Sequence, residues 1–148
     1  MILPQGKEWH MIYATARMTI PFKKLDEALE ILGSIMQRTS FESGCVSCNV
    51  YREVESENAI MIEEIWKNEE DLARHLRSDE YQKILLLAEM ASSPPEIRFY
   101  TIQRSAGVEA IEKARNVGEE AKTWRAEPGA PGTNSFEEKM GPSGNAGV

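Results

Sequence analysis

The sequence of 148 residues is poor in cysteine and histidine, the side chains that metal and redox sites commonly use, and it has fewer basic than acidic residues. It contains two cysteines and two histidines, and acidic residues outnumber basic ones to give a net charge of −7. No Lys/Arg cluster is present to neutralise a phosphate backbone, so we expect no nucleic-acid partner. The negative charge also argues against attraction to an anionic membrane surface.

The sequence also shows no segment typical of a membrane span or a secretory signal. No apolar run approaches the roughly 20 residues of a membrane-spanning helix. The first residues, Met1 to Gly6, do not combine a positively charged segment with an apolar one, as a secretory signal would. We therefore expect a cytoplasmic protein without a membrane partner.

Three kinds of catalytic motif are absent. The sequence has no glycine-rich phosphate loop, no nucleophile elbow and no cluster of metal ligands. Nucleotide-binding, hydrolase and metalloenzyme functions therefore lack support, and we expect no cofactor and no metal ion.

The two cysteines, Cys45 and Cys48, have a C-x-x-C spacing in a run that is typical of a strand. Residues three apart on a regular strand point to opposite faces of a sheet, which hinders a disulfide between them. We interpret both as structural free thiols, with redox chemistry or metal binding as the alternatives.

Hydropathy patterns predict four strands and two helical regions in the order βαββαβ. The strands are expected at 9–20, 45–54, 59–66 and 96–103. The first helix carries an apolar stripe from Leu25 to Met36, and the second region begins after Asn68, a good N-cap residue, with a break at 78–79. This order predicts an α+β, ferredoxin-like fold, with an antiparallel four-stranded sheet covered by helices on one face.

The C-terminal third has a different composition. We expect a globular domain over 8–104, a helical extension with a thin apolar stripe over 105–125, and a disordered Pro/Gly/Ser-rich tail over 126–148.

The third strand carries large apolar side chains on both of its faces. Ile60, Ile62 and Trp66 alternate with Met61 and Ile65. Helices of one small domain cover only one face, so the other would expose an apolar patch. The simplest cover is a second copy of the chain, which predicts a homodimer that stacks sheet against sheet.

Several residues together resemble the antibiotic biosynthesis monooxygenase family over about 11–103. They are Gly44-Cys45-Val46-Ser47, Tyr51-Arg52, Glu64-Ile65-Trp66, Leu72, His75-Leu76, Ser78 and Tyr81. The resemblance implies a dimeric α+β barrel. In better-understood members it implies oxidation of aromatic, quinol-like compounds by O₂ without metal or flavin. The same fold also serves heme degradation, decarboxylation, stress response and simple binding.

The resemblance also disfavours two specific chemistries. Heme-degrading relatives need a histidine and an asparagine at positions that match Leu85 and Ala16 in this sequence. Some polyketide-oxidising relatives carry an asparagine at the position that matches Ile62.

Glu64 and His75 are the candidate catalytic residues. Glu64 lies two positions before Trp66 on the same strand face and could take a phenolic proton. The alternative is an ion pair with Arg17 or Arg52 across the sheet. His75 titrates near neutrality and could accept a proton or orient a substrate oxygen, and the alternative is a hydrogen-bonded packing residue.

Four aromatic residues are candidates for substrate binding. Trp66 is expected to lie in the core or to form a pocket wall, and Tyr51, Tyr81 and Tyr100 could form hydrogen bonds to a small apolar or aromatic ligand. Two functions stay open at this point. One is a cofactor-independent monooxygenase acting on a quinol-like compound, and the other is a non-catalytic dimer that binds a small molecule or has a stress or regulatory role.

Overall fold

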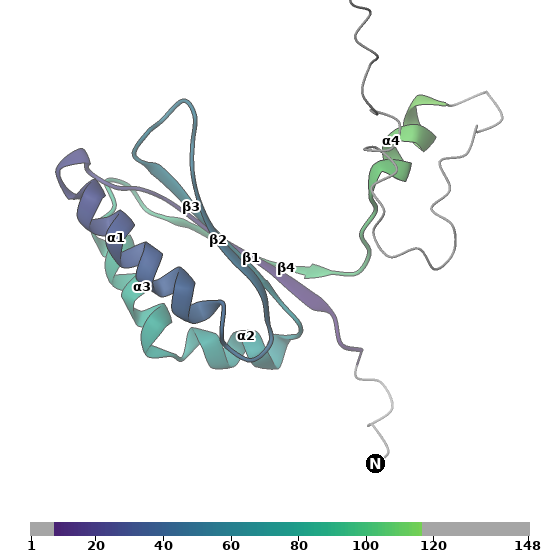
Figure 1. Ribbon diagram of the computed structural model, residues 1–148, viewed down its shortest axis with the longest axis horizontal. Coiled ribbons are helices and arrows are strands. Elements are labelled where there is room, and N and C mark those ends of the chain that lie inside the picture. The colour runs from purple at the N-terminus through teal and green to yellow at the C-terminus, as the bar shows by residue number, and fades with distance from the viewer. Residues whose placement is uncertain (1–7, 117–148) are drawn as a thin grey trace, which may run out of the picture. The chain divides into compact units, whose positions relative to one another are not determined.

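The computed structural model describes residues 8–116, which form four strands and four helices (Figure 1). The strands are β1 (Met11–Thr19), β2 (Cys45–Arg52), β3 (Ala59–Trp66) and β4 (Glu96–Ile102). The helices are α1 (Phe22–Thr39), α2 (Glu69–Leu76), α3 (Asp79–Glu89) and α4 (Val108–Arg115).

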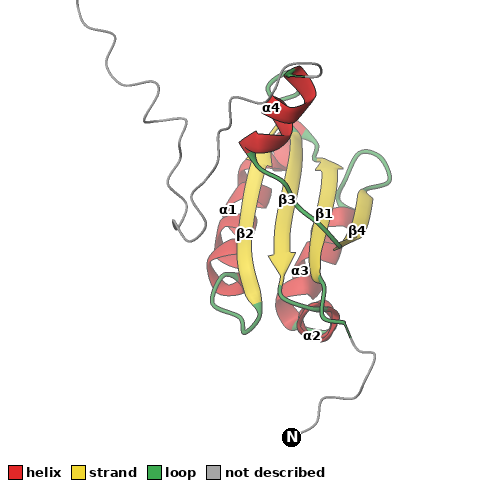
Figure 2. Cartoon of the chain, turned by 90° about the vertical axis from the view of Figure 1, so that its right-hand side faces the viewer, coloured by secondary structure: helices red, strands yellow, loops and turns green. Residues whose placement is uncertain are grey.

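The four strands form one antiparallel sheet in the order β2-β3-β1-β4. Helices α1 and α3 lie on one side of this sheet, and α2 lies near one end of it (Figures 1 and 2). We call the side that α1 and α3 cover the inner face and the opposite side the outer face. This arrangement confirms the predicted ferredoxin-like α+β fold.

The core lies between the inner face and the two long helices. Alternate residues of β1, such as Ala16 and Met18, point inward beside Ile60 and Ile62 of β3. The apolar stripe predicted on the first helix meets them, with Leu25, Ala28, Leu32 and Ile35 buried. Burying one such aliphatic side chain contributes roughly 1.5–3 kcal/mol, so this stripe fixes α1 on the sheet.

Side-chain caps explain the break between α2 and α3. The Asn68 side chain accepts a hydrogen bond of 2.9 Å from the Asp71 backbone N–H, and Ser78 accepts one of 3.2 Å from the Tyr81 N–H. Each cap satisfies a backbone donor that a helix start leaves unpaired. The predicted N-cap at Asn68 and the break at 78–79 are confirmed.

A bulge in β2 overturns the prediction that the two cysteines face opposite ways. Cys45 lies opposite Trp66 and Cys48 opposite Glu64, with a register shift between Cys45 and Ser47. The extra residue, Val46, is 49% exposed and not on the inner face, where regular alternation would place it. Both cysteines therefore lie on the inner face, and both are free thiols.

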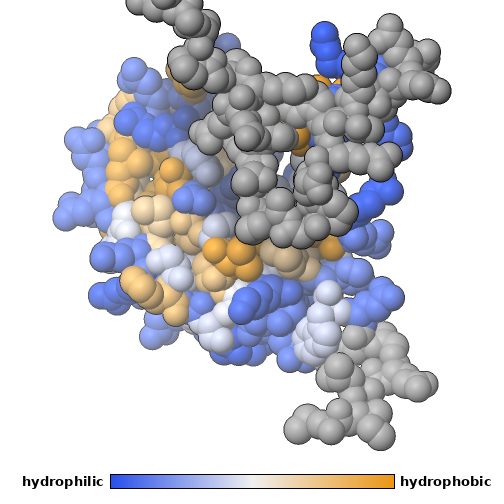
Figure 3. Space-filling view, turned by 45° about the vertical axis from the view of Figure 1, so that its right-hand side comes forward, coloured by the Kyte–Doolittle hydropathy of each residue, from blue (hydrophilic) through white to orange (hydrophobic). Residues whose placement is uncertain are grey.

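The outer face combines apolar and polar side chains. Met11, Tyr51 and Tyr100 are exposed there, and Met61 and Ile65 are half-buried. In the space-filling view that is turned toward this side, hydrophobic residues gather across the middle and hydrophilic ones surround them (Figure 3). The expected second apolar face is thus present, with polar residues interspersed.

The chain divides into two compact units, residues 1–103 and 104–148, and the second contains α4. The expected extension over 105–125 is helical at Val108–Arg115. Its part beyond residue 116 and the tail expected over 126–148 lie outside the described residues. None of the helices in the described part of the chain is long and apolar enough to cross a membrane.

Candidate active site

His75 of α2 lies fully buried between two carboxylates. Its Nδ1 atom is 3.0 and 3.1 Å from the two carboxylate oxygens of Glu42, and its Nε2 atom is 3.2 Å from Oε1 of Glu64. The side chain of His75 is 0% exposed, that of Glu64 4% and that of Glu42 26%. Glu42, His75 and Glu64 thus form a row of hydrogen-bonded side chains, which runs from the partly exposed Glu42 to the buried Glu64.

Two aromatic side chains, Trp66 and Tyr81, pack around His75 and Glu64. The Trp66 indole N–H donates a hydrogen bond of 2.8 Å to Oε2 of Glu64. The indole also stacks on the His75 ring with centroids 4.6 Å apart, and Tyr81 meets the same ring edge-on at 5.4 Å. Both oxygens of Glu64 therefore have a donor, and the imidazole is held on two sides.

The local fold explains why these side chains meet. Glu64 and Trp66 are two residues apart on β3, so both point to the inner face. Glu42 comes from the loop that joins α1 to β2, and this loop turns at Gly44 with a φ of +87°. A Cβ atom at Gly44 would lie 2.2–2.4 Å from side-chain atoms of Asp71 in α2, so glycine permits the close approach of this loop to α2.

The two carboxylates favour a protonated histidine. Burial alone would lower the pKa of His75, but the hydrogen bond and charge of Glu64, followed by those of Glu42, outweigh it and raise the pKa above its ordinary value of 6.5. The raised pKa favours the imidazolium form, in which both nitrogens donate hydrogen bonds to carboxylates.

Two thiols and one phenol near this site are kept neutral. Burial raises the pKa of the Cys48 thiol to about 12 and that of Cys45 to about 11, and the charge of Glu64 adds to both effects. Burial, helped by Glu64, also raises the pKa of Tyr81. A thiol with so high a pKa is a poor nucleophile, which supports the structural role predicted for both cysteines.

A small cavity adjoins Glu64 between the sheet and α3. Its lining consists of Ala14, Thr15, Ala16, Ile62, Glu64, Tyr81, Ile84 and Phe99. About 10 Å³ is open to the centre of a water-sized sphere, which is close to the minimum for one water molecule. Phe99 of β4 is the most exposed lining residue, at 47%. It therefore marks the side on which the cavity approaches solvent.

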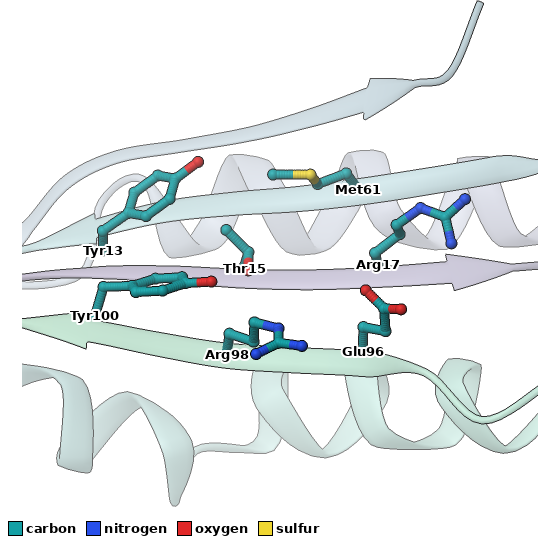
Figure 4. A pocket seen from close by; sticks show the side chains of 7 residues that line it. All are labelled: Tyr13, Thr15, Arg17, Met61, Glu96, Arg98 and Tyr100. Atoms are coloured by element: carbon teal, nitrogen blue, oxygen red, sulfur yellow. The ribbon is translucent and has the colours of Figure 1, made fainter. Parts of the chain in front are cut away.

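A second, wider depression lies on the outer face. It has a volume of about 410 Å³ and is lined from β1, β3 and β4 by Tyr13, Thr15, Arg17, Met61, Glu96, Arg98 and Tyr100 (Figure 4). The Tyr13 hydroxyl donates a hydrogen bond of 2.6 Å to Glu63, which is the largest cause that raises its pKa to about 12. The depression holds no acid–histidine pair among its lining residues.

The predicted site residues fall into two groups. Glu64, His75, Trp66 and Tyr81 come together on the inner face. Trp66 is fully buried against Glu64 and His75 and does not line the cavity.

The other two tyrosines do not join that group. Tyr51 lies opposite Met61 on the outer face, and Tyr100 lies opposite Tyr13 there. Both are about half exposed. No single ligand site on one face therefore includes all six predicted residues.

The alternative ion pairs considered for Glu64 are wrong. Arg17 pairs with Glu53, and Arg52 donates hydrogen bonds of 2.8 and 3.0 Å to the backbone oxygen of Glu57. Glu64 points to the opposite face, where His75 and Trp66 bind it. His75 is fully buried and hydrogen-bonded, as its interpretation as a hydrogen-bonded packing residue requires, and both of its hydrogen-bond partners are carboxylates.

Sequence reasoning missed Glu42. This residue is in a loop between elements, 33 positions from His75, and no spacing rule relates the two. The only signal was its position two residues before Gly44, the glycine at which the loop turns toward α2.

In the part of the chain that the structure describes, no group of three or more His, Cys, Asp or Glu side chains could hold a metal ion.

Comparison with known proteins gives related sequences and folds. Over 70 residues the chain is 34% identical to the uncharacterized protein YjcS of Bacillus subtilis (strain 168), in a match that covers 47% of this chain and 66% of that one, just under two-thirds of its length. A conserved protein from Methanosarcina mazei Go1 is 30% identical, with a TM-score of 0.60 over 64% of this chain and 95% of that one.

A solved antibiotic biosynthesis monooxygenase shares the fold. Its TM-score is 0.58 at 13% identity, and the match covers 63% of this chain and 99% of that one. The family model for antibiotic biosynthesis monooxygenases matches residues 11–85, just over half of the sequence, and this segment includes β1, α1, β2, β3, α2 and most of α3. The chain therefore belongs to the antibiotic biosynthesis monooxygenase family.

Proposed function

We propose that this protein is a cofactor-independent monooxygenase that oxidises a small aromatic, quinol-like compound with O₂. The observation that carries the proposal is the position of Glu64. Its carboxylate borders the inner cavity and is held by His75 at 3.2 Å and Trp66 at 2.8 Å. A buried carboxylate beside an apolar cavity is suited to take a proton from a bound phenol.

Proton removal is the main chemical task of the protein in such a reaction. Glu64 accepts the phenolic proton, and the electron-rich anion that remains reacts with O₂. Apolar lining residues such as Ile62 and Ile84 exclude water from the anion. The Trp66 indole and the His75 ring fix the carboxylate in place, so that Glu64 needs no rearrangement before it accepts the proton.

An aromatic ring needs more room than the inner cavity has in this structure. Substrate binding therefore requires a lining side chain to move, and Phe99 is the exposed one. Ala14 and Ala16 of β1 place only methyl groups on the sheet side of the cavity. Displacement of Phe99 would admit a flat ring between α3 and β4, next to Glu64.

A second copy of the chain is the proposed partner. The outer face carries exposed Met11, Tyr51 and Tyr100 together with charged residues of both signs, including Glu63 and Arg98. A surface that contains both apolar groups and both charges can be complementary to itself, as a two-fold dimer requires. This dimer would cover the outer depression.

A non-catalytic role in binding a small molecule is the second candidate. The small volume of the inner cavity favours it, because a regulatory or stress protein needs no room for a reaction beside Glu64. The outer depression, with two tyrosines and two arginines, could hold a ligand in that case.

Oxygen uptake with a panel of hydroquinones separates the two functions. We expect consumption of O₂ by the wild-type protein and a loss of at least tenfold in Glu64→Gln, which keeps the shape of the side chain but cannot act as a base. Glu27→Gln, on the exposed face of α1, is the matched control and should keep the wild-type rate. Equal rates in all three proteins would exclude Glu64 as the base, and no uptake in any would favour the binding function.

A further inference from the structure

Glu42 connects the buried site to the surface. Its carboxylate oxygens lie 3.0 and 3.1 Å from Nδ1 of His75, whereas the opposite ring nitrogen lies 3.2 Å from Glu64. Glu42 is the partly exposed end of this line, and Glu64 is the end that borders the inner cavity. Three titratable side chains thus form a continuous path of hydrogen bonds from the cavity wall to solvent.

We propose that Glu42 is the outlet of a proton path that runs from the inner cavity through Glu64 and His75 to solvent. The proposal rests on the proposed function in one respect, namely that Glu64 takes the substrate proton. It assigns to Glu42 a positioning and proton-exchange role, since this residue does not border the cavity.

The protons and charges along the path balance. With both glutamates ionised and His75 protonated, the cluster has a net charge of −1. When Glu64 accepts a proton from the substrate and becomes neutral, the proton on Nδ1 of His75 passes to Glu42 and then to water. His75 is left as a neutral ring with its Nε2–H toward Glu64, and Glu42 is again a carboxylate.

The net charge of the cluster is −1 before and after this exchange. Export of the His75 proton keeps the charge of this cluster constant, whereas the phenolate left by the substrate adds one negative charge to the site until O₂ oxidises it. When Glu64 returns its proton to the reduced oxygen atom that leaves as water, His75 regains a proton from solvent through Glu42.

The His75 ring hydrogen-bonds to Glu42 and Glu64, and Glu42 is the more exposed of the two. Tyr81 of α3 meets the ring edge-on, and Cys45 and Cys48 of β2 lie opposite Trp66 and Glu64 in the sheet. The raised pKa values of the two thiols and the phenol keep these groups neutral. Proton exchange with solvent therefore depends on Glu42.

Nitrogen-15 NMR of the His75 ring tests the path without any substrate. In the wild-type protein we expect the Nδ1 proton, on the Glu42 side, to exchange with water faster than the Nε2 proton. In Glu42→Gln, which keeps a hydrogen-bond acceptor but cannot carry the proton, exchange at Nδ1 should slow at least tenfold. Glu42→Asp should restore much of the rate, and the control Glu27→Gln should match the wild type.

The electrostatic effect of Glu64 on the protonation of His75 can be tested separately. Glu64→Gln imitates the protonated state of Glu64, so His75 should lose its proton at lower pH in this variant than in the wild type. Unchanged exchange in Glu42→Gln, or faster exchange at Nε2 than at Nδ1 in the wild-type protein, would overturn the proposal. If Glu42→Gln does not fold, the relative exchange rates of the Nδ1 and Nε2 protons in the wild-type protein still test the proposal. Absence of O₂ uptake counts against the proposed function alone, because these measurements involve no oxidation.

Discussion

The imidazole of His75 stacks on the indole of Trp66 with ring centroids 4.6 Å apart and an interplanar angle of 27°. This contact joins helix α2 to the last residue of strand β3, and both rings bind the same carboxylate, that of Glu64. An aromatic stack over a buried ion pair therefore connects the helix that follows the hairpin to the hairpin itself. The stability of this region should depend on His75 more than on other polar residues of α2.

Replacement of His75 by alanine should destabilise the protein strongly. The change leaves the buried Glu64 without a positive partner and removes the ring that packs on Trp66. Breaking a buried charge pair by removal of one partner costs about 3–5 kcal/mol, and urea unfolding measures this. His10→Ala is the control, because the side chain of His10 is partly exposed and lies 3.2 Å from the exposed Glu8. A loss below about 1 kcal/mol for His75→Ala would mean that the ion pair does not form.

The same ion pair predicts how stability changes with pH. The pKa of His75 is raised in the folded protein, so the folded state binds the proton more tightly than the unfolded state does. The stabilisation is fully present below the unfolded pKa, about 6.5 for histidine. It is lost as pH rises from that value through the higher folded pKa. We expect the Tm of the wild-type protein to fall across this window relative to that of His75→Gln, measured by calorimetry. A wild-type Tm that rises in parallel with that of the variant would contradict the protonated state of His75.

The fold was more predictable from the sequence than the site. Strand β3 was located at Ala59–Trp66 without error, because its alternation and the polar break before it are local signals. The bulge at Val46 was not predictable, since one extra residue in β2 leaves the hydropathy pattern nearly unchanged. Glu42 was missed for a similar reason. Its role depends on a loop conformation that brings together residues far apart in the sequence.

Gly44→Ala should be destabilising although the added group is one methyl. Gly44 has a φ of +87°, and a Cβ atom there would overlap the side chain of Asp71. A non-glycine residue in such a conformation costs of order 1–3 kcal/mol, and the overlap should also displace the loop that carries Glu42. Gly33→Ala, in the middle of α1, is the control, because nothing lies within 4 Å of its added Cβ. It should be neutral or slightly stabilising. Similar unfolding curves for the two variants would show that the turn tolerates a side chain.

Truncation of Phe99 should open the inner cavity. Phe99 lines the cavity and is 47% exposed, so Phe99→Ala removes a ring between solvent and Glu64 without cutting into the main core. We expect tighter binding of a small phenol in this variant than in the wild type, followed by NMR shifts at Tyr81 and Glu64. Phe41→Ala, at an exposed aromatic residue in the loop after α1, is the control. If phenol shifts neither residue in Phe99→Ala, the cavity is not the ligand site.

A charge on the outer face should dissociate the proposed dimer. Tyr51 is 50% exposed and lies on the outer face of β2, so Tyr51→Glu changes no core contact within one chain. In a two-fold dimer the substitution occurs twice in one interface, and the two carboxylates add to the cost of burying charge there. Sedimentation at micromolar concentration should show a dimer for the wild type and a monomer for Tyr51→Glu. Phe22→Glu places the same charge on α1, where Phe22 is 67% exposed, and should remain dimeric. A monomeric wild-type protein would exclude the sheet-stacked dimer, whereas dissociation by Phe22→Glu alone would move the interface to the helical side.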